Sequence, residues 1–214
     1  ARAFADEPSR LVRVVGVQAG WPGLEDPLLD APLAVAEGRE PPSRSFDAYA
    51  VTGYFGYGVA SEEGARALRA ALADGTAAAL AEEAARADIV DLRDRLWPHH
   101  AAAAARRGLR LVAYEAGTHA VGQGPVVDDE AITAFLNEWS YSPEMGALHA
   151  ELQAAWTASG GTLLAPFVDV ASPSKWGSWG ALRHPDDRNS RWDAVVAWNA
   201  SPPAWEERDL ATFA

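Results

Sequence analysis

Four short apolar segments, separated by stretches with helical spacing, constrain the fold more than any other feature of this sequence. Each is rich in Val, Leu, Tyr or Phe and is bounded by turn-forming residues, as buried strands are. They are LVRVVGVQAG (11–20), DAYAVTGYFG (47–56), LRLVAYEAG (109–117) and TLLAPFVDV (162–170). Strands that alternate with helices pair in parallel through right-handed crossovers. The pattern therefore predicts an α/β fold of four β/α units.

Helix signals fill the intervening segments. The Ala-rich stretch 76–107 carries apolar residues at helical spacing, and Pro98 is expected to kink or restart this helix. Ser142 is the predicted N-cap of a helix that ends at Gly160 and Gly161, just before the fourth strand. Asp128 is the predicted N-cap of a shorter helix. The second and third connections between strands thus each contain at least one helix signal.

Parallel β/α units form either a doubly wound sheet or a barrel. The segment GTHAVGQG (117–124) follows a strand but lacks the G-x-G-x-x-G spacing of a dinucleotide-binding turn. A TIM-type (β/α)₈ barrel needs eight units, and this chain has four. We therefore expect one domain, residues 1–214, that forms half of such a barrel.

Composition excludes several classes of partner and cofactor. The chain has 214 residues, of which 49% are hydrophobic, so a core can form without disulfides or a metal. It has no cysteine, which excludes thiolate metal sites, and we expect neither a metal nor a cofactor. A net charge of −12 argues against nucleic acid, whose binding needs clustered Lys and Arg.

The ends and the hydropathy of the chain bear on its location. No apolar run approaches the roughly 20 residues that span a bilayer, so no membrane partner is expected. The N-terminus ARAFADEPSR has neither an initiator Met nor the apolar core of a signal peptide, which predicts a processed or excised product. Secretion and cytoplasmic location both remain open.

In a barrel, functional side chains lie where strands end on the carboxyl face. That layer contains Gln18, Tyr54, Glu115 and Asp169, one after each predicted strand. Glu115 is the leading candidate because a carboxylate at the end of the apolar run LVAY is desolvated on one side and open to a cleft on the other. A salt bridge or helix cap at a strand end is the alternative role.

Three segments together resemble the carboxyl-terminal half of a clan A glycoside hydrolase barrel, as found in bacterial barrel proteins with Y-E-x-G-x-H and S-K-W-G-S-W-G segments. They are DAYAVTGYFG, LVAYEAGTHAVG and APFVDVASPSKWGSWGAL. The resemblance covers about residues 11 to 185. It implies that Glu115 is the nucleophile of a retaining reaction, that Tyr54 hydrogen-bonds it, and that Trp176 or Trp179 forms the floor of a sugar site.

The resemblance is incomplete at one position. The clan's general acid/base is a Glu preceded by Asn at the end of the fourth strand, and no residue upstream of Leu11 can supply it. Retaining hydrolysis needs two carboxyl groups roughly 5 to 5.5 Å apart, and Asp169 is only a weak substitute. Either the chain is the C-terminal half of a longer barrel, or it keeps the fold without the full reaction.

These alternatives leave three functions open. The first is a glycoside hydrolase acting on a polysaccharide or glycoside, and the second is a non-catalytic carbohydrate-binding barrel. The third is a scaffold or interaction module. Four strands cannot close a barrel, so their edges need the missing N-terminal half, a second copy of the chain or covering segments. The isolated chain is expected to show no glycosidase turnover, because one carboxylate cannot both attack and protonate.

The remaining polar candidates are weaker. His119, four residues after Glu115, could orient that carboxylate or contact a sugar hydroxyl. His99 and His100 are adjacent in a helix, so we expect a solvated surface and no shared metal there. Lys175 is expected to be an exposed loop residue.

Strand alternation gives a specific expectation for the site. In L-V-A-Y-E, we expect Leu111, Ala113 and Glu115 to face inward, and Val112 and Tyr114 to contact the helices. The second strand is expected to end before Tyr54. Tyr54 would then turn inward to hydrogen-bond Glu115, with His119 and a Trp of the SKWGSWG loop beside them.

Overall fold

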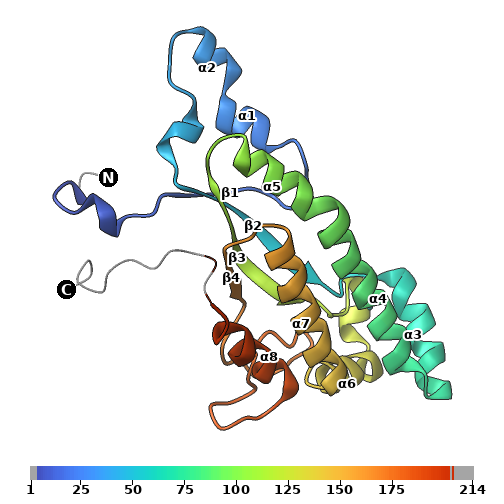
Figure 1. Ribbon diagram of the computed structural model, residues 1–214. Coiled ribbons are helices and arrows are strands. Elements are labelled where there is room, and N and C mark those ends of the chain that lie inside the picture. Colours follow the sequence, from blue (N-terminus) through green and yellow to red (C-terminus); the bar gives the residue numbers. More distant parts are fainter. Residues whose placement is uncertain (1–3, 203, 205–214) are drawn as a thin grey trace.

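The computed structural model describes residues 4–202 and 204. At its centre is a four-stranded sheet in which every neighbouring pair is parallel (Figure 1). In spatial order, which is also chain order, the strands are β1 (Val14–Gly16), β2 (Ala48–Phe55), β3 (Arg110–Thr118) and β4 (Leu163–Pro166). The predicted α/β fold with four parallel strands is confirmed.

Helices occupy the connections between the strands and follow the last strand. Their bounds in chain order are α1 (Glu25–Asp30), α2 (Pro32–Ala36), α3 (Glu62–Asp74), α4 (Ala77–Asp91), α5 (Trp97–Ala105), α6 (Glu130–Trp139), α7 (Pro143–Ala158) and α8 (Ser190–Asn199). Short 3₁₀ turns lie at η2 (Pro8–Arg10), η3 (Pro42–Ser45) and η5 (Gly124–Asp128).

The helical stretch before β3 continues through Pro98. A π-helical turn, η4 (Leu92–Leu96), joins α4 to α5, and the two helices run almost in line (Figure 1). Proline has no backbone N–H to donate to the carbonyl four residues earlier, and a π turn locally relaxes that hydrogen-bond pattern. The predicted disturbance at Pro98 is therefore a local widening of one long helix.

The predicted caps of α6 and α7 can be compared with the structure. The Ser142 hydroxyl accepts a hydrogen bond from the backbone N–H of Met145 and caps α7, as expected. The cap of α6 is Asp129, which accepts from the N–H of Ile132, so the prediction of Asp128 was wrong by one residue. Asp128 instead pairs with Lys175 at 2.6 Å.

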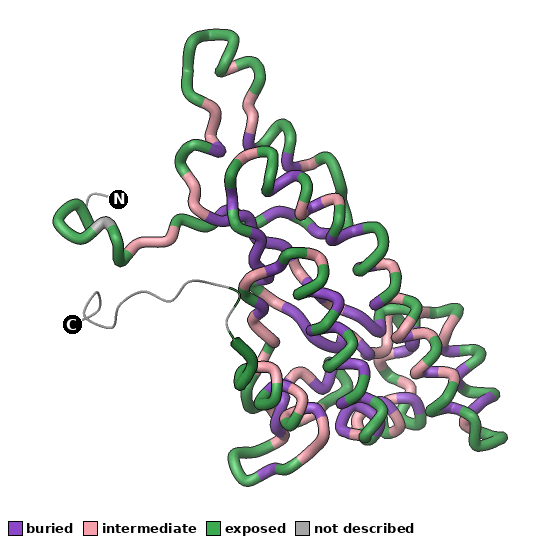
Figure 2. The backbone as a smooth tube through the Cα atoms, in the orientation of Figure 1, coloured by how far each residue is buried: buried purple, intermediate pink, exposed green. Residues whose placement is uncertain are grey.

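One face of the sheet is covered by helices α4, α5 and α7, and the principal core lies between them and the strands (Figures 1 and 2). Trp97 of α5 and Trp156 of α7 are fully buried there, with ring centroids 5.1 Å apart in an edge-to-face arrangement. Tyr49 and Phe55 of β2 point into the same layer. Burial of these large side chains contributes to the apolar stabilisation of this face.

The opposite face of the sheet carries only a small apolar cluster. Ala48, Ala50 and Val112 form it, and Val12 packs against it. We call this side the open face. It also carries Val14 and Leu163, whose exposed fractions are 48% and 50%.

A β-bulge in β3 changes the alternation of side chains. Val51 is paired with Ala113, but the next residue, Thr52, is paired with Glu115, so Tyr114 has no partner in β2. An unpaired extra residue shifts every later side chain of its strand to the other face. Tyr114 lies over the open face, because a β-carbon built on Gly16 would be 3.9 Å from its ring.

The bulge overturns most of the expected face assignments in L-V-A-Y-E. Leu111 and Ala113 belong to the core under the helices, whereas Val112 and Tyr114 lie on the open face. All four positions are thus the reverse of the prediction. Only Glu115 lies on the side expected for it, because the bulge restores it to the open face.

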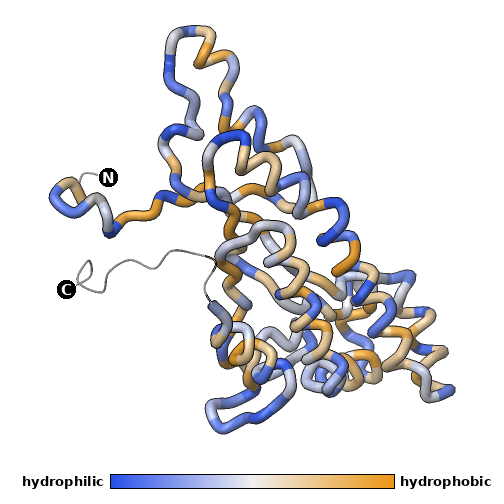
Figure 3. The backbone as a smooth tube through the Cα atoms, viewed as in Figure 1, coloured by the Kyte–Doolittle hydropathy of each residue, from blue (hydrophilic) through white to orange (hydrophobic). Residues whose placement is uncertain are grey.

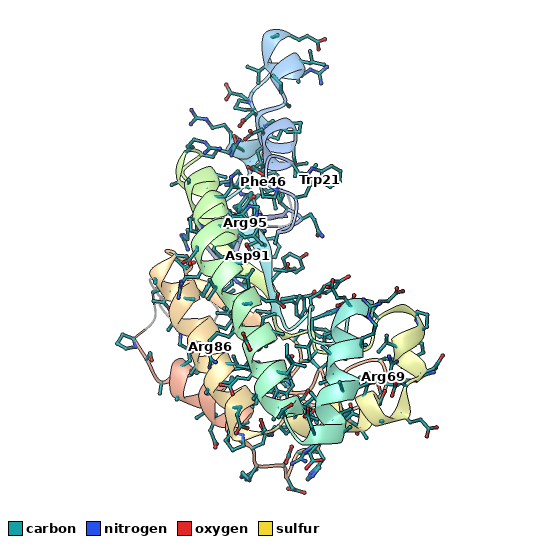
Figure 4. All side chains as sticks on the ribbon, turned by 90° about the vertical axis from the view of Figure 1, so that its right-hand side faces the viewer. Trp21, Phe46, Arg69, Arg86, Asp91 and Arg95 are labelled. Carbon is teal, nitrogen blue, oxygen red and sulfur yellow. The ribbon has the colours of Figure 1, made fainter. Side chains whose placement is uncertain are left out.

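Ion pairs connect the helices at the surface. Arg86 of α4 contacts Glu151 of α7 at 3.0 Å, and Arg69 of α3 contacts Asp129 at 2.6 Å. Figure 4 shows that Arg86 and Arg69 lie on different helices of the outer layer. Exposed pairs contribute about 0–1 kcal/mol each, so the core fixes the helix layer more than these contacts do. Within the described residues, no helix combines the length and apolar character needed to cross a membrane.

Candidate functional site

A carboxylate and a tyrosine meet on the open face, towards the carboxyl ends of β2 and β3. The Tyr54 hydroxyl donates a hydrogen bond to Oε2 of Glu115 at 3.1 Å. The predicted contact is therefore present. The expected strand end was wrong, because β2 continues through Phe55 and alternation alone places Phe55 under the helices and Tyr54 on the open face. Glu115 likewise lies within β3, which extends to Thr118.

Aromatic rings enclose this pair on one side. The rings of His119 and Trp179 lie edge-on to Tyr54, with centroid distances of 5.8 and 6.1 Å. His119 and Trp179 also contact each other, at 5.1 Å. The ring of Tyr57 stacks on His119 at 5.3 Å, and Phe167 lies against Trp179 at 6.1 Å. These contacts bring three sequence-predicted residues, Tyr54, His119 and Trp179, into one cluster, to which Glu115 is joined through the Tyr54 hydroxyl.

The protonation states of the site follow from its burial. Burial raises the pKa of Tyr54, and the negative charge of Glu115 raises it further, so the phenol keeps its proton and remains a donor to the carboxylate. Burial lowers the pKa of His119, which keeps its imidazole neutral at physiological pH. The carboxylate thus has a neutral donor beside it and no cation within the aromatic enclosure formed by these described residues.

The loop that carries Trp179 is held from below by a buried arginine. Arg191 at the start of α8 is 1% exposed, and its guanidinium donates to the backbone carbonyls of Ser178 at 2.6 Å and Trp179 at 2.7 Å. The indole of Trp179 packs over Gly177, where an added β-carbon would lie 2.5 Å from the ring. The Trp179 Nε1 atom donates to the carbonyl of Trp176 at 2.9 Å. The position of the indole is therefore fixed by the backbone beneath it.

The other sequence-predicted residues lie outside this group. Gln18 is exposed in the loop after β1, and Asp169 is exposed in the loop after β4. Trp176 is 64% exposed, and its ring contacts the Lys175 ammonium at 4.8 Å. No contact of these side chains with Glu115 or Tyr54 is recorded in the described part of the chain. Lys175 itself is exposed, as expected, but is paired with Asp128.

The adjacent histidines correct another expectation. His100 is fully buried: Nδ1 lies 2.7 Å from the Tyr49 hydroxyl and Nε2 lies 2.9 Å from the carbonyl of Ala19. His99 contacts the buried carboxylate of Glu25 at 2.6 Å. A solvated surface was thus the wrong interpretation for His100.

Ligand atoms of Glu25, His99 and His100 lie within 4.8 Å of one another, a spacing that a metal ion could use. Both nitrogens of His100 and the carboxylate of Glu25 already have hydrogen-bond partners, and Glu25 also accepts from the N–H of Gly23. These contacts join the β1–α1 loop to α5. The cluster is explained by this structural role.

Sequence reasoning missed three residues of the site. Tyr57 and Phe167 line the aromatic enclosure, and Arg191 positions the Trp179 loop. Tyr57 follows β2 by two residues, so its place in the strand-end layer could have indicated it. No sequence signal links Arg191 to the loop, because the contact depends on how α8 folds back.

Comparison of the chain with protein-family models, with curated protein sequences and with solved structures found no match in any of the three.

Proposed function

We propose that this chain forms the nucleophile-bearing half of a carbohydrate-processing barrel of the glycoside hydrolase type. Glu115 is the nucleophile, Tyr54 its hydrogen-bond donor, and His119 and Trp179 form a wall of the sugar site. A retaining reaction on a glycoside or polysaccharide then proceeds through a glycosyl ester on Glu115. The general acid/base comes from the other half of the barrel.

The observation that carries this proposal is the hydrogen bond between Tyr54 and Glu115 inside an aromatic enclosure. A nucleophilic carboxylate must be held in a fixed orientation, and a neutral phenol that donates to it at 3.1 Å does so without adding a positive charge. Aromatic rings beside a carboxylate can pack against the apolar faces of sugar rings, and the sugar hydroxyls can then form hydrogen bonds with the polar groups of the site.

The sheet also supports the proposal. Four parallel strands in chain order, with helices on one face, are the arrangement expected for half of a (β/α)₈ barrel. The site lies on the face opposite those helices, towards the carboxyl ends of the strands, where barrel enzymes place their reactive groups.

The decisive experiment uses a substrate that needs no general acid. Aryl glycosides with a dinitrophenyl leaving group and fluorine in place of the 2-hydroxyl can be attacked by a carboxylate without proton donation. The Glu115 carboxylate forms a bond to the anomeric carbon, and dinitrophenolate leaves with the electron pair. We expect intact-mass spectrometry of the purified chain to show one fluoroglycosyl adduct, which peptide mapping places on Glu115.

Matched variants decide the interpretation. Glu115→Gln should form no adduct, whereas Glu63→Gln, an exposed carboxylate on α3, should behave as the wild type. Tyr54→Phe should slow labelling at least tenfold. Sugar binding by calorimetry without any adduct, across glucosides, galactosides, mannosides and xylosides, would favour the non-catalytic carbohydrate-binding barrel. Neither adduct nor binding would refute both functions.

A further inference from the structure

The rings of the aromatic enclosure are set at steep angles to one another. Tyr54, His119 and Trp179 make interplanar angles between 62° and 78°. Tyr57 stacks on His119 and is 59% exposed, so its ring borders solvent. Several aromatic rings set at different angles are the arrangement of an aromatic cage, whose negative ring faces bind cations.

The carboxylate of Glu115 adds a full negative charge beside these rings. Its Oε2 accepts from the Tyr54 hydroxyl at 3.1 Å, so the carboxylate lies one hydrogen bond from the enclosure. The imidazole of His119 does not offset that charge, because burial lowers its pKa and keeps it neutral. Ring faces and carboxylate therefore both attract a positive charge and repel an anion.

A second carboxylate lies on the Tyr57 side of the enclosure. The Gln123 side chain donates to the Tyr57 carbonyl, which joins the loop after β3 to the loop after β2. The next residue is Gly124, where an added β-carbon would lie 3.3 Å from Oε1 of Glu62. Glu62 is exposed and forms no ion pair with any described residue. Its negative charge therefore adds to that of Glu115 at this end of the sheet.

A third carboxylate lies on the Trp179 side. The N–H of Val168 donates to the Trp179 carbonyl at 2.9 Å, and the exposed Asp169 follows directly in the chain. The cations of the same region are engaged by other groups. Lys175 is paired with a carboxylate at 2.6 Å, and Arg191 donates to backbone carbonyls beneath the loop. Negative charge thus dominates around the enclosure, as it does in the whole chain, whose net charge is −12.

The surroundings of the enclosure favour a hydrophilic ligand. Figure 3 shows hydrophilic sequence along the outer part of the loop between β4 and α8, which includes Arg183, Asp186 and Arg188. An apolar partner needs a continuous apolar surface, and this loop interrupts one. A sugar combines an apolar ring face for the aromatic rings with polar groups for the loop.

We propose that the site takes a sugar with a protonated amine, so that the substrate is a glycoside or polysaccharide of unacetylated amino sugars. This inference rests on the proposed function, in which the enclosure is part of the sugar site. An amine at C2 is bonded to the carbon next to the anomeric centre, which Glu115 attacks. Binding therefore brings the ammonium close to the carboxylate and the rings. An N-acetyl group removes the positive charge and a uronic acid reverses it, so both lose the attraction.

The test compares ligands that differ only at C2. Methyl glycosides of glucosamine, galactosamine and mannosamine are titrated into the purified chain and followed by NMR, each beside its N-acetyl and its 2-hydroxy counterpart. At a pH below the pKa of the sugar amine, we expect at least one amine to bind at least about tenfold more tightly than both of its counterparts. Added NaCl should weaken binding of that amine and leave binding of the neutral counterparts unchanged.

Matched variants assign the preference to the enclosure. Glu115→Gln should remove most of the preference for the amine, whereas the neutral sugars should keep their affinity. Tyr57→Leu should weaken amine binding at least about threefold, and Tyr57→Phe should not, because a phenyl ring keeps the negative face that leucine lacks. Trp21→Leu is the control, since this indole is 65% exposed and makes no ring contact with the enclosure within the described part of the chain.

Equal affinity for the amine and its counterparts in all three series would overturn the proposal, as would a complete lack of amine binding. A preference that survives Glu115→Gln or high salt would also overturn it. The fluoroglycoside adduct reports separately on the proposed function. Labelling of Glu115 without a preference for amines keeps the nucleophile and refutes the substrate class, whereas a preference for amines without an adduct keeps the cationic sugar as the ligand of a binding barrel.

Discussion

Removal of one hydroxyl group should destabilise the fold measurably. The Tyr49 side chain is fully buried, and its hydroxyl lies 2.7 Å from Nδ1 of His100. Burial lowers the pKa of His100, so the ring is neutral; its Nε2–H donates to the carbonyl of Ala19, and Nδ1 accepts from Tyr49. Tyr49→Phe therefore leaves a buried nitrogen with no donor.

The expected cost follows from that unsatisfied nitrogen. A buried polar group without a partner costs about 1–3 kcal/mol. For a chain of this size each kcal/mol lowers the melting temperature by roughly 2–4 °C, which predicts a drop of roughly 2–12 °C. Urea titration followed by circular dichroism measures the free energy of unfolding, and a thermal scan measures the melting temperature.

Controls separate the hydrogen bond from the general effect of a Tyr to Phe change. Tyr114→Phe removes a hydroxyl from an exposed ring and should change stability by less than about 0.5 kcal/mol. In a His100→Leu background, Tyr49→Phe should cost nothing, because the nitrogen that it would orphan is gone. Equal unfolding free energies for Tyr49→Phe and Tyr114→Phe would refute the reasoning.

Three further predictions concern stability and packing. Burial lowers the pKa values of His149 and His119, so the unfolded chain binds more protons; stability should be full above about pH 6.5 and fall as the pH drops below it, in urea titrations at successive pH values. Asp187→Asn should cost roughly 2–3 kcal/mol in the same assay, because this buried carboxylate accepts several charge-assisted hydrogen bonds that hold its pKa well below its usual range. Gly146→Ala should lower the melting temperature despite the better helix propensity of alanine, because its β-carbon would lie 2.6 Å from the β-carbon of Ser190 and push α8 from α7; an unchanged or raised melting temperature would contradict that close contact.

The parts of the fold that could be predicted are those determined by local sequence. Runs of Val, Leu and Tyr mark the strands, and Ser142 followed by proline marks the start of α7, because capping needs only neighbouring residues. The π turn before Pro98 and the shift of the α6 cap by one residue depend on competing local hydrogen bonds of similar energy. Sequence patterns do not distinguish between such local alternatives.

The parts of the site that could not be predicted depend on contacts between distant residues. Tyr54 and Glu115 could be paired from the sequence because both lie towards the carboxyl ends of neighbouring parallel strands. The burial of His100 depends on Tyr49 and Ala19, which are far from it in sequence, and the role of Arg191 depends on the return of α8. Adjacent histidines in an Ala-rich helix give no sign of either partner.

The bulge at Tyr114 divides β3 into two stretches whose side chains alternate in opposite phase, one in the amino-terminal half of the strand and one in the carboxyl-terminal half. In the amino-terminal stretch even-numbered side chains face the open side, and in the carboxyl-terminal stretch odd-numbered ones do. A regular pleat that paired Tyr114 with Thr52 would instead turn the Glu115 carboxylate into the apolar layer beneath the helices. The acidic group is thus presented on the open face by the bulged conformation at Tyr114, and a strand of ordinary pleat could not present the same sequence in the same way.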